Sequence, residues 1–212
     1  MNVDPLECNI VKNCAATLAG LGTAGIFNAD CPDPLCLENR LRELNLRLSP
    51  KGVKAEVLFF RKNTALIYVY RPSRLARCLE EPEARELLFR YGYVDAGMSD
   101  SLERLRERFR ESRGFPHEIG IFLGYPAYDV RQFIENNGRN YLCCGVWKAY
   151  SREEEARLIF SRVRHCTQVY RRELEKGADI DRLTVPEMAI GRGRRGRGGA
   201  GWNGICHARG RI

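Results

Sequence analysis

Two adjacent stretches rich in β-branched and aromatic residues constrain the fold of this chain most strongly. Val53–Phe60 and Ala65–Tyr70 have the composition of β-strands, and Lys62-Asn63 between them is typical of a tight turn. The pattern therefore predicts an antiparallel hairpin. Amphipathic helical patterns flank it at Pro5–Leu21, Leu35–Leu48 and Ser151–Lys176. Together they predict the α+β class, with several helices packed on a small, mainly antiparallel sheet.

The composition changes near residue 187. Eight of the 20 glycines lie between Gly191 and Gly210, and the stretch from Gly191 to the end has six arginines and no acidic residue. Such a segment buries too little apolar surface to offset its backbone entropy. We therefore predict a single folded domain at residues 1–186 and a disordered Gly/Arg-rich tail at residues 187–212.

The tail also carries most of the net charge of +8. A basic chain is a candidate for nucleic-acid binding, and in this chain only the tail is strongly basic. Arginines can hold phosphates without sequence preference and a tryptophan can stack on a base. The residues concerned are Arg192, Arg194, Arg195, Arg197 and Trp202. The alternative is a disordered extension with no such role.

The cellular compartment is predicted from apolar runs and cysteines. No run of 18 apolar residues is present, which argues against a membrane span. The first residues include Asp4 and Glu7 and lack the apolar region of a secretory signal. The nine cysteines are odd in number and irregularly spaced. This pattern indicates reduced thiols in the cytoplasm.

The most distinctive motifs lie in the second half of the chain. HEIGIFLGYPAYDVRQFIENNG at His117–Gly138, followed by CCGVWKAY at Cys143–Tyr150, is similar to the bacterial domain-of-unknown-function family 3793, found mainly in anaerobic Gram-positive bacteria. The segment NCAATLAG also resembles the opening motif of that family, but this chain has Asn13 and Ala16 where members tend to have His and Pro. The resemblance spans about residues 5–186. It implies a link to metal or redox housekeeping and no particular reaction.

These same motifs predict a ligand-binding cleft between a pair of short helices at His117–Gly138 and a strand at Leu142–Tyr150. Side chains alternate between the two faces of a strand, so Lys148 and Tyr150 share one face. A lysine on such a face can bind a phosphate or a carboxylate, and the alternative is a solvated face. The candidate ligand-binding residues are His117, Glu118, Tyr125, Cys144, Trp147, Lys148 and Tyr150.

Several of these residues have alternative interpretations. His117 and Glu118 can act as a general base or metal ligand, or can cap the helix that follows. Cys143 and Cys144 are adjacent on the strand and should face opposite sides, so one is expected in the core. A weak set of metal ligands, of the types that bind zinc or iron–sulfur centres, is Cys14, Cys144, Cys166 and His117. No short spacing supports a metal site.

The sequence leaves three functions open. The first is a cytoplasmic accessory or ligand-binding protein, with a small molecule or a protein as partner and no membrane contact. The second is an enzyme in which His117, Lys148 or a cysteine acts as acid, base or nucleophile. The third is nonspecific nucleic-acid binding through the tail. The sequence has no Walker loop, G-x-S-x-G or H-E-x-x-H motif, which disfavours the common nucleotide, hydrolase and zinc-protease chemistries.

Overall fold

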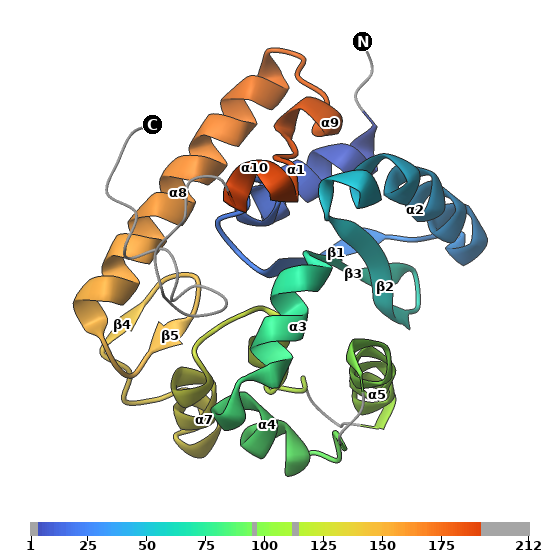
Figure 1. The fold of residues 1–212 in the computed structure, drawn as a ribbon. Coiled ribbons are helices and arrows are strands. Elements are labelled where there is room, and N and C mark those ends of the chain that lie inside the picture. The colour runs from blue at the N-terminus through green and yellow to red at the C-terminus, as the bar shows by residue number, and fades with distance from the viewer. Residues whose placement is uncertain (1–3, 95–96, 112–114, 192–212) are drawn as a thin grey trace. The chain divides into compact units, whose positions relative to one another are not determined.

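Helices predominate in the computed structural model, which describes residues 4–94, 97–111 and 115–191 (Figure 1). They accompany a small antiparallel sheet, so the predicted α+β class is confirmed. Within these residues, no helix combines the length and the apolar character that crossing a bilayer requires.

The chain divides into two compact units. Within the described residues, unit 1 comprises residues 4–72 and 163–191, and unit 2 comprises residues 73–94, 97–111 and 115–162. The long helix α8 (Glu153–Glu175) therefore contributes its first turns to unit 2 and its last turns to unit 1. Unit 1 is thus assembled from two stretches that are far apart in the sequence.

The sheet of unit 1 has three strands, β1 (Ala24–Asp30), β2 (Lys54–Arg61) and β3 (Thr64–Tyr70), in the order β1-β3-β2. Strands β2 and β3 form the predicted hairpin. Strand β1 was not predicted, and it pairs with β3 along its whole length. Its Gly25 is required by packing, because a Cβ atom there would lie 2.9 Å from the Cys14 sulfur of the neighbouring helix.

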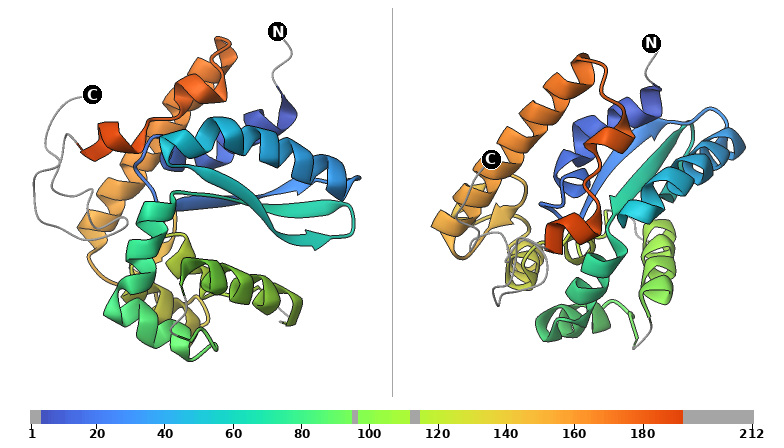
Figure 2. Two further views of the ribbon diagram at one scale, coloured as in Figure 1. Left: turned by 45° about the vertical axis from the view of Figure 1, so that its right-hand side comes forward. Right: turned by 45° about the horizontal axis from the view of Figure 1, so that its top comes forward.

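Two helices, α1 (Pro5–Leu18) and α2 (Pro34–Leu48), cover one face of this sheet (Figure 2). Each starts with an aspartate followed by a proline, and the side chains of Asp4 and Asp33 accept hydrogen bonds from backbone N–H groups of the first turn. The apolar stripes of both helices join alternate strand residues in one core, which includes Ile10, Leu18, Leu41, Leu48, Ile67 and Val69.

Arg71, directly after β3, has a fully buried side chain that joins separate segments of unit 1. Its guanidinium donates to the backbone oxygens of Thr17 (2.7 Å), Leu18 (2.8 Å) and Val185 (2.8 Å). It also forms an ion pair of 3.0 Å with Glu187. The first two oxygens belong to the last turn of α1, and each also accepts a backbone N–H group, from Gly20 (3.1 Å) and Val185 (3.0 Å) respectively. Arg71 therefore adds a charged donor to these oxygens and links α1 to the segment before α10.

Glu187 opens the short helix α10 (Glu187–Gly191), which follows α9 (Ile180–Leu183). The tail was predicted to begin at residue 187, so the described structure continues five residues beyond the predicted end of the folded domain. The ion pair with Arg71 holds Glu187, the first residue of this helix, against the rest of unit 1. The remainder of the predicted tail, residues 192–212, lies outside the described residues.

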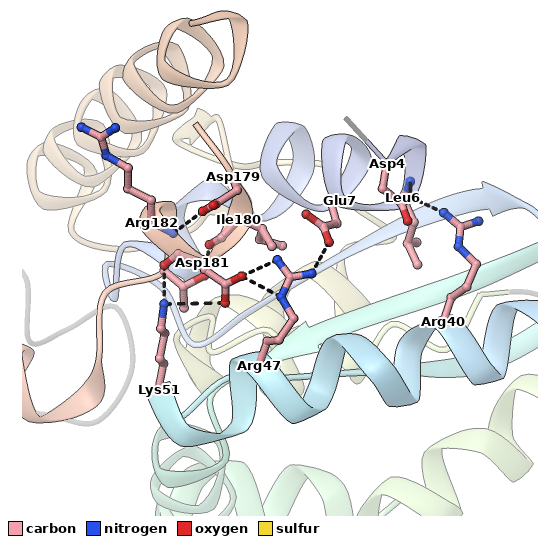
Figure 3. Close-up of polar contacts among 11 residues, drawn as sticks. Asp4, Leu6, Glu7, Arg40, Arg47, Lys51, Asp179, Ile180, Asp181 and Arg182 are labelled. Carbon is pink, nitrogen blue, oxygen red and sulfur yellow. Dashed lines mark hydrogen bonds and ion pairs between the residues drawn. The ribbon is translucent and has the colours of Figure 1, made fainter. Parts of the chain in front are cut away.

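A network of charged side chains on the surface of unit 1 connects α1, α2 and α9 (Figure 3). Arg47 of α2 donates to Glu7 of α1 at 2.6 Å and to Asp181 of α9 at 2.6 Å. Lys51 contacts the same aspartate. Exposed ion pairs stabilise a protein by at most about 1 kcal/mol each, so we assign this network a supporting role in helix packing.

Unit 2 is built from short helices and a small hairpin. The helices are α3 (Pro72–Glu80), α4 (Pro82–Phe89), α5 (Met98–Glu111), α6 (Ile119–Phe122) and α7 (Ala127–Glu135). The predicted pair of short helices is present as α6 and α7, with the break at Gly124, whose φ is +80°. The hairpin consists of β4 (Cys143–Cys144) and β5 (Lys148–Ala149).

The single strand predicted at Leu142–Tyr150 is therefore wrong. The chain reverses at Gly145 and Val146, and the N–H of Gly145 donates to the Trp147 oxygen at 3.0 Å. A Cβ atom at position 145 would lie 2.2 Å from the Phe160 ring, so only glycine fits this turn. The predicted alternation still holds after the turn, where Trp147 and Ala149 are buried and Lys148 is partly exposed.

Candidate functional site

A cavity of about 300 Å³ lies in unit 2 between the α6–α7 pair and the β4–β5 hairpin. Ile119, Val130 and Trp147, which line it, are buried and form an apolar floor. His117 and Cys144, which also line it, are exposed and form a rim. The cavity has the size of the smaller pockets that bind small molecules in proteins.

The cavity brings together most of the candidate residues proposed from the sequence. His117, Tyr125, Cys144, Trp147 and Lys148 all line it. They come from three separate elements, namely the segment before α6, the break between α6 and α7, and the hairpin. Two candidates, Glu118 and Tyr150, do not line the cavity.

Asp129 of α7 organises one side of this cavity. Its carboxylate is 2% exposed and accepts hydrogen bonds from the Trp147 indole N–H (2.8 Å), the Tyr150 backbone N–H (3.0 Å) and the Ser151 hydroxyl (3.2 Å). These bonds fix the indole ring and tie the hairpin to α7. Asp129 is not among the residues predicted from the sequence. The available signal was an acidic residue next to Val130 on the apolar side of a short helix, since a buried carboxylate requires donors.

Aromatic rings surround the fixed indole of Trp147. The Tyr125 ring stacks on it with centroids 5.4 Å apart, and the Phe160 ring meets it edge-on at 4.7 Å. Burial raises the pKa of Tyr125 to about 12, so its phenol is neutral near pH 7. Tyr125 and Trp147 therefore form a preformed aromatic wall of the cavity, and Phe160 supports the indole without lining the cavity.

Lys148 contributes an ammonium group to the lining of the same cavity. Its Nζ donates to the Gly138 oxygen at 2.7 Å and lies 5.7 Å from the Phe133 ring centroid and 4.8 Å from that of Tyr141. Gly138 has a φ of +70°, and a Cβ atom there would lie 3.0 Å from the Phe133 ring and 3.4 Å from Nζ. Glycine at this position therefore lets the ring and the ammonium group approach each other.

The two adjacent cysteines face opposite sides of the hairpin, as predicted. Cys143 is buried, and burial raises the pKa of its thiol. Cys144 is exposed at the rim of the cavity, where the strand register places it directly opposite Lys148. Residues opposite each other in a two-stranded ladder point to the same face, so the thiol and the ammonium group belong to one surface.

Glu118 has a structural role that differs from both roles predicted for it. It occupies the N-cap position of α6, but its side chain forms no capping hydrogen bond. Instead this buried carboxylate pairs with Arg108 of α5 at 2.7 Å, and the same guanidinium lies over the Tyr91 ring. The capping interpretation is therefore wrong for Glu118, because a buried carboxylate is held better by a cation than by a helix end.

The weak set of metal ligands is not assembled. Among residues 4–94, 97–111 and 115–191, no group of three or more His, Cys, Asp and Glu side chains is placed to hold a metal ion. Cys14 and Cys166 belong to unit 1, whereas His117 and Cys144 belong to unit 2. Burial raises the pKa of Cys166 to about 11 and that of Cys14 further, which opposes the thiolate form that binds metals. The tail residues proposed for nucleic-acid binding lie outside the described residues: Arg192, Arg194, Arg195, Arg197 and Trp202.

Comparison with known proteins gives one match. The sequence profile of a family described as "Protein of unknown function (DUF3793)" matches residues 10–184. No curated protein and no solved structure matches the chain. The matched region includes both stretches that form the cavity, His117–Gly138 and Cys143–Tyr150.

Proposed function

This chain belongs to the DUF3793 family, and we propose that it is a ligand-binding protein whose cavity in unit 2 holds a small, largely apolar molecule. The proposal rests mainly on one observation about the cavity. A buried floor of aliphatic and aromatic side chains is continuous with a rim that is exposed to solvent. A molecule can therefore enter from water and lose contact with it at the floor, which is the main driving force for binding apolar ligands.

The rigidity of the walls supports the same proposal. Asp129 fixes Trp147, Tyr125 stacks on the indole, and Gly138 and two rings hold Lys148. These contacts exist without a ligand, so few side chains need ordering when one binds. Preorganisation of this kind improves affinity because it lowers the entropy lost on binding.

A cytoplasmic location is part of the proposal and rests on the number and irregular spacing of the nine cysteines. The wider role, in metal or redox housekeeping of a bacterial cell, rests on the family resemblance alone. Within the cavity, Cys144 is the residue whose chemistry would connect ligand binding with a redox role.

Trp147 makes the proposal testable, because it is part of the cavity. Replacing the other tryptophan (Trp202→Phe) leaves Trp147 as the sole source of indole fluorescence. We expect naphthalene-2-carboxamide, a neutral two-ring probe, or the matching carboxylate to change this fluorescence saturably. Val146→Phe, which fills the cavity, should abolish the change. Val169→Phe, on α8 and outside the cavity lining, should not. The proposal fails if neither probe gives a saturable signal or if Val146→Phe leaves binding intact.

Thiol chemistry at the rim is a second candidate function, and the exposure of Cys144 in the lining of the cavity favours it. A cysteine beside a bound molecule can act on it as a nucleophile. We expect iodoacetamide to modify Cys144 faster than Cys36, which is also exposed but lies on α2. Mass spectrometry of the alkylated peptides measures both rates. Equal rates would remove this candidate and leave the ligand-binding proposal in place.

A further inference from the structure

The charge inside the cavity indicates which polar group its ligand carries. Lys148 contributes a positive charge to the lining. In the part of the chain that the structure describes, the contacts of its ammonium group are one backbone oxygen and two aromatic rings, with no carboxylate. An ammonium group has three N–H donors, so donors are left after the bond to Gly138.

The surroundings of Lys148 make it a strong anchor for an anion. Its side chain is partly buried, and the Phe133 ring displaces water from one side of the ammonium group. Much of the cost of removing this charge from water is therefore already incurred in the free protein. Electrostatic attraction is also stronger beside apolar walls than in bulk water.

Asp129 limits the charge that the anion can carry. Its buried carboxylate also lines the cavity, and the donors that hold it are uncharged groups. Among the described residues, no second lysine and no arginine lines the cavity with Lys148. A phosphate with two negative charges would meet one ammonium group and one nearby carboxylate, whereas a singly charged carboxylate is balanced by Lys148 alone.

From these observations we propose that the cavity binds aromatic carboxylates, with the rings on the Trp147 side and the carboxylate at the Lys148 ammonium group. This inference rests on the proposed function, because it names the class of ligand for the same cavity. Trp147 and Tyr125 line that side of the cavity with aromatic rings, and contact between aromatic rings adds to the burial of their area.

The test compares two probes that differ in charge and share their rings. Naphthalene-2-carboxylate and naphthalene-2-carboxamide are titrated into the Trp202→Phe protein, and Trp147 fluorescence reports binding. A hydrogen bond between charged groups in such a site favours the carboxylate by about 10- to 100-fold in Kd. A third probe, 2-naphthyl phosphate, should bind more weakly than the carboxylate. Equal affinities for carboxylate and carboxamide, or tighter binding of the phosphate, would overturn the inference.

Replacing Lys148 tests whether this residue causes the preference for the carboxylate over the carboxamide. Lys148→Met should bind the two naphthalene probes equally and retain the affinity for the carboxamide. The control is Lys12→Met, which removes an exposed lysine from α1 and should keep the preference. A preference that survives in a folded Lys148→Met protein refutes the role of this residue. The comparison of probes in the parent protein needs no substitution, so it decides the inference even if that variant misfolds. Binding of neither probe would instead refute the proposed function.

Discussion

Replacing Arg71 with methionine should destabilise unit 1 by about 3 kcal/mol. Methionine keeps much of the apolar stem but removes the donors to the oxygens of Thr17, Leu18 and Val185. A hydrogen bond contributes a net of about 0.5–1.5 kcal/mol, and the loss of these three therefore costs about 3 kcal/mol, although the oxygens of Thr17 and Leu18 keep the backbone N–H groups of Gly20 and Val185. The ion pair with Glu187, whose side chain is 30% exposed, adds at most about 1 kcal/mol.

Urea denaturation followed by circular dichroism measures this loss. A typical protein is stable by about 5–15 kcal/mol, so the midpoint of Arg71→Met should fall clearly. Glu187→Gln removes only the ion pair and should change the free energy of unfolding by less than about 1 kcal/mol. Arg42→Met removes an arginine from the exposed side of α2 and should be nearly neutral. If Arg71→Met unfolds at the same urea concentration as Arg42→Met, the reasoning about the buried hydrogen bonds of Arg71 is refuted.

Three further predictions concern packing and ionisation. Gly145→Ala should lower the free energy of unfolding by about 1–3 kcal/mol, because the added Cβ would overlap the buried Phe160 ring. In the control Gly97→Ala the added Cβ meets no atom within 4 Å. Thermal denaturation measures both variants, and equal melting temperatures would contradict the prediction. The raised pKa of Tyr125, about 12 against an ordinary value of 10.0, means that the fold favours the neutral phenol. Its contribution to stability is therefore complete below pH 10 and is lost as the pH rises to about 12. A tyrosinate absorbance titration should lose a step near pH 12 in Tyr125→Phe. The thiol of Cys166, with a pKa of about 11, should resist alkylation by iodoacetamide at pH 8 in the native protein and react once the protein is unfolded; rapid labelling of the native protein would show that it is not buried.

The sequence predicts the elements whose pattern is local. The hairpin of β2 and β3 follows from two apolar runs around a turn, and the break between α6 and α7 follows from Gly124 and Pro126. Strand β1 escapes prediction because AGIFNAD has small and polar residues of low strand propensity. It becomes a strand because β3 offers it a hydrogen-bonding edge along seven residue pairs, and this pairing is a property of the tertiary structure.

The site is predictable to a similar extent. Aromatic, cationic and sulfur-bearing residues in two neighbouring motifs indicate a cleft, and the cavity brings His117, Cys144 and Lys148 to one lining. The residues that hold these groups in place were not predictable. Asp129 acts through donors about 20 residues away, and Glu118 acts through a cation on another helix. Such partners depend on how helices pack, which spacing along the chain does not encode.

The bonds made by Arg71 also affect the order in which the chain can acquire its structure during synthesis. Arg71 leaves the ribosome long before Val185 and Glu187. Its guanidinium group can therefore bind these two partners only after nearly the entire second half of the polypeptide has been synthesised. All of residues 73–162 are available for folding in that interval. A chain shortened after Thr184 would leave Arg71 permanently short of these two partners, so truncations of this protein should retain residues up to Gly191.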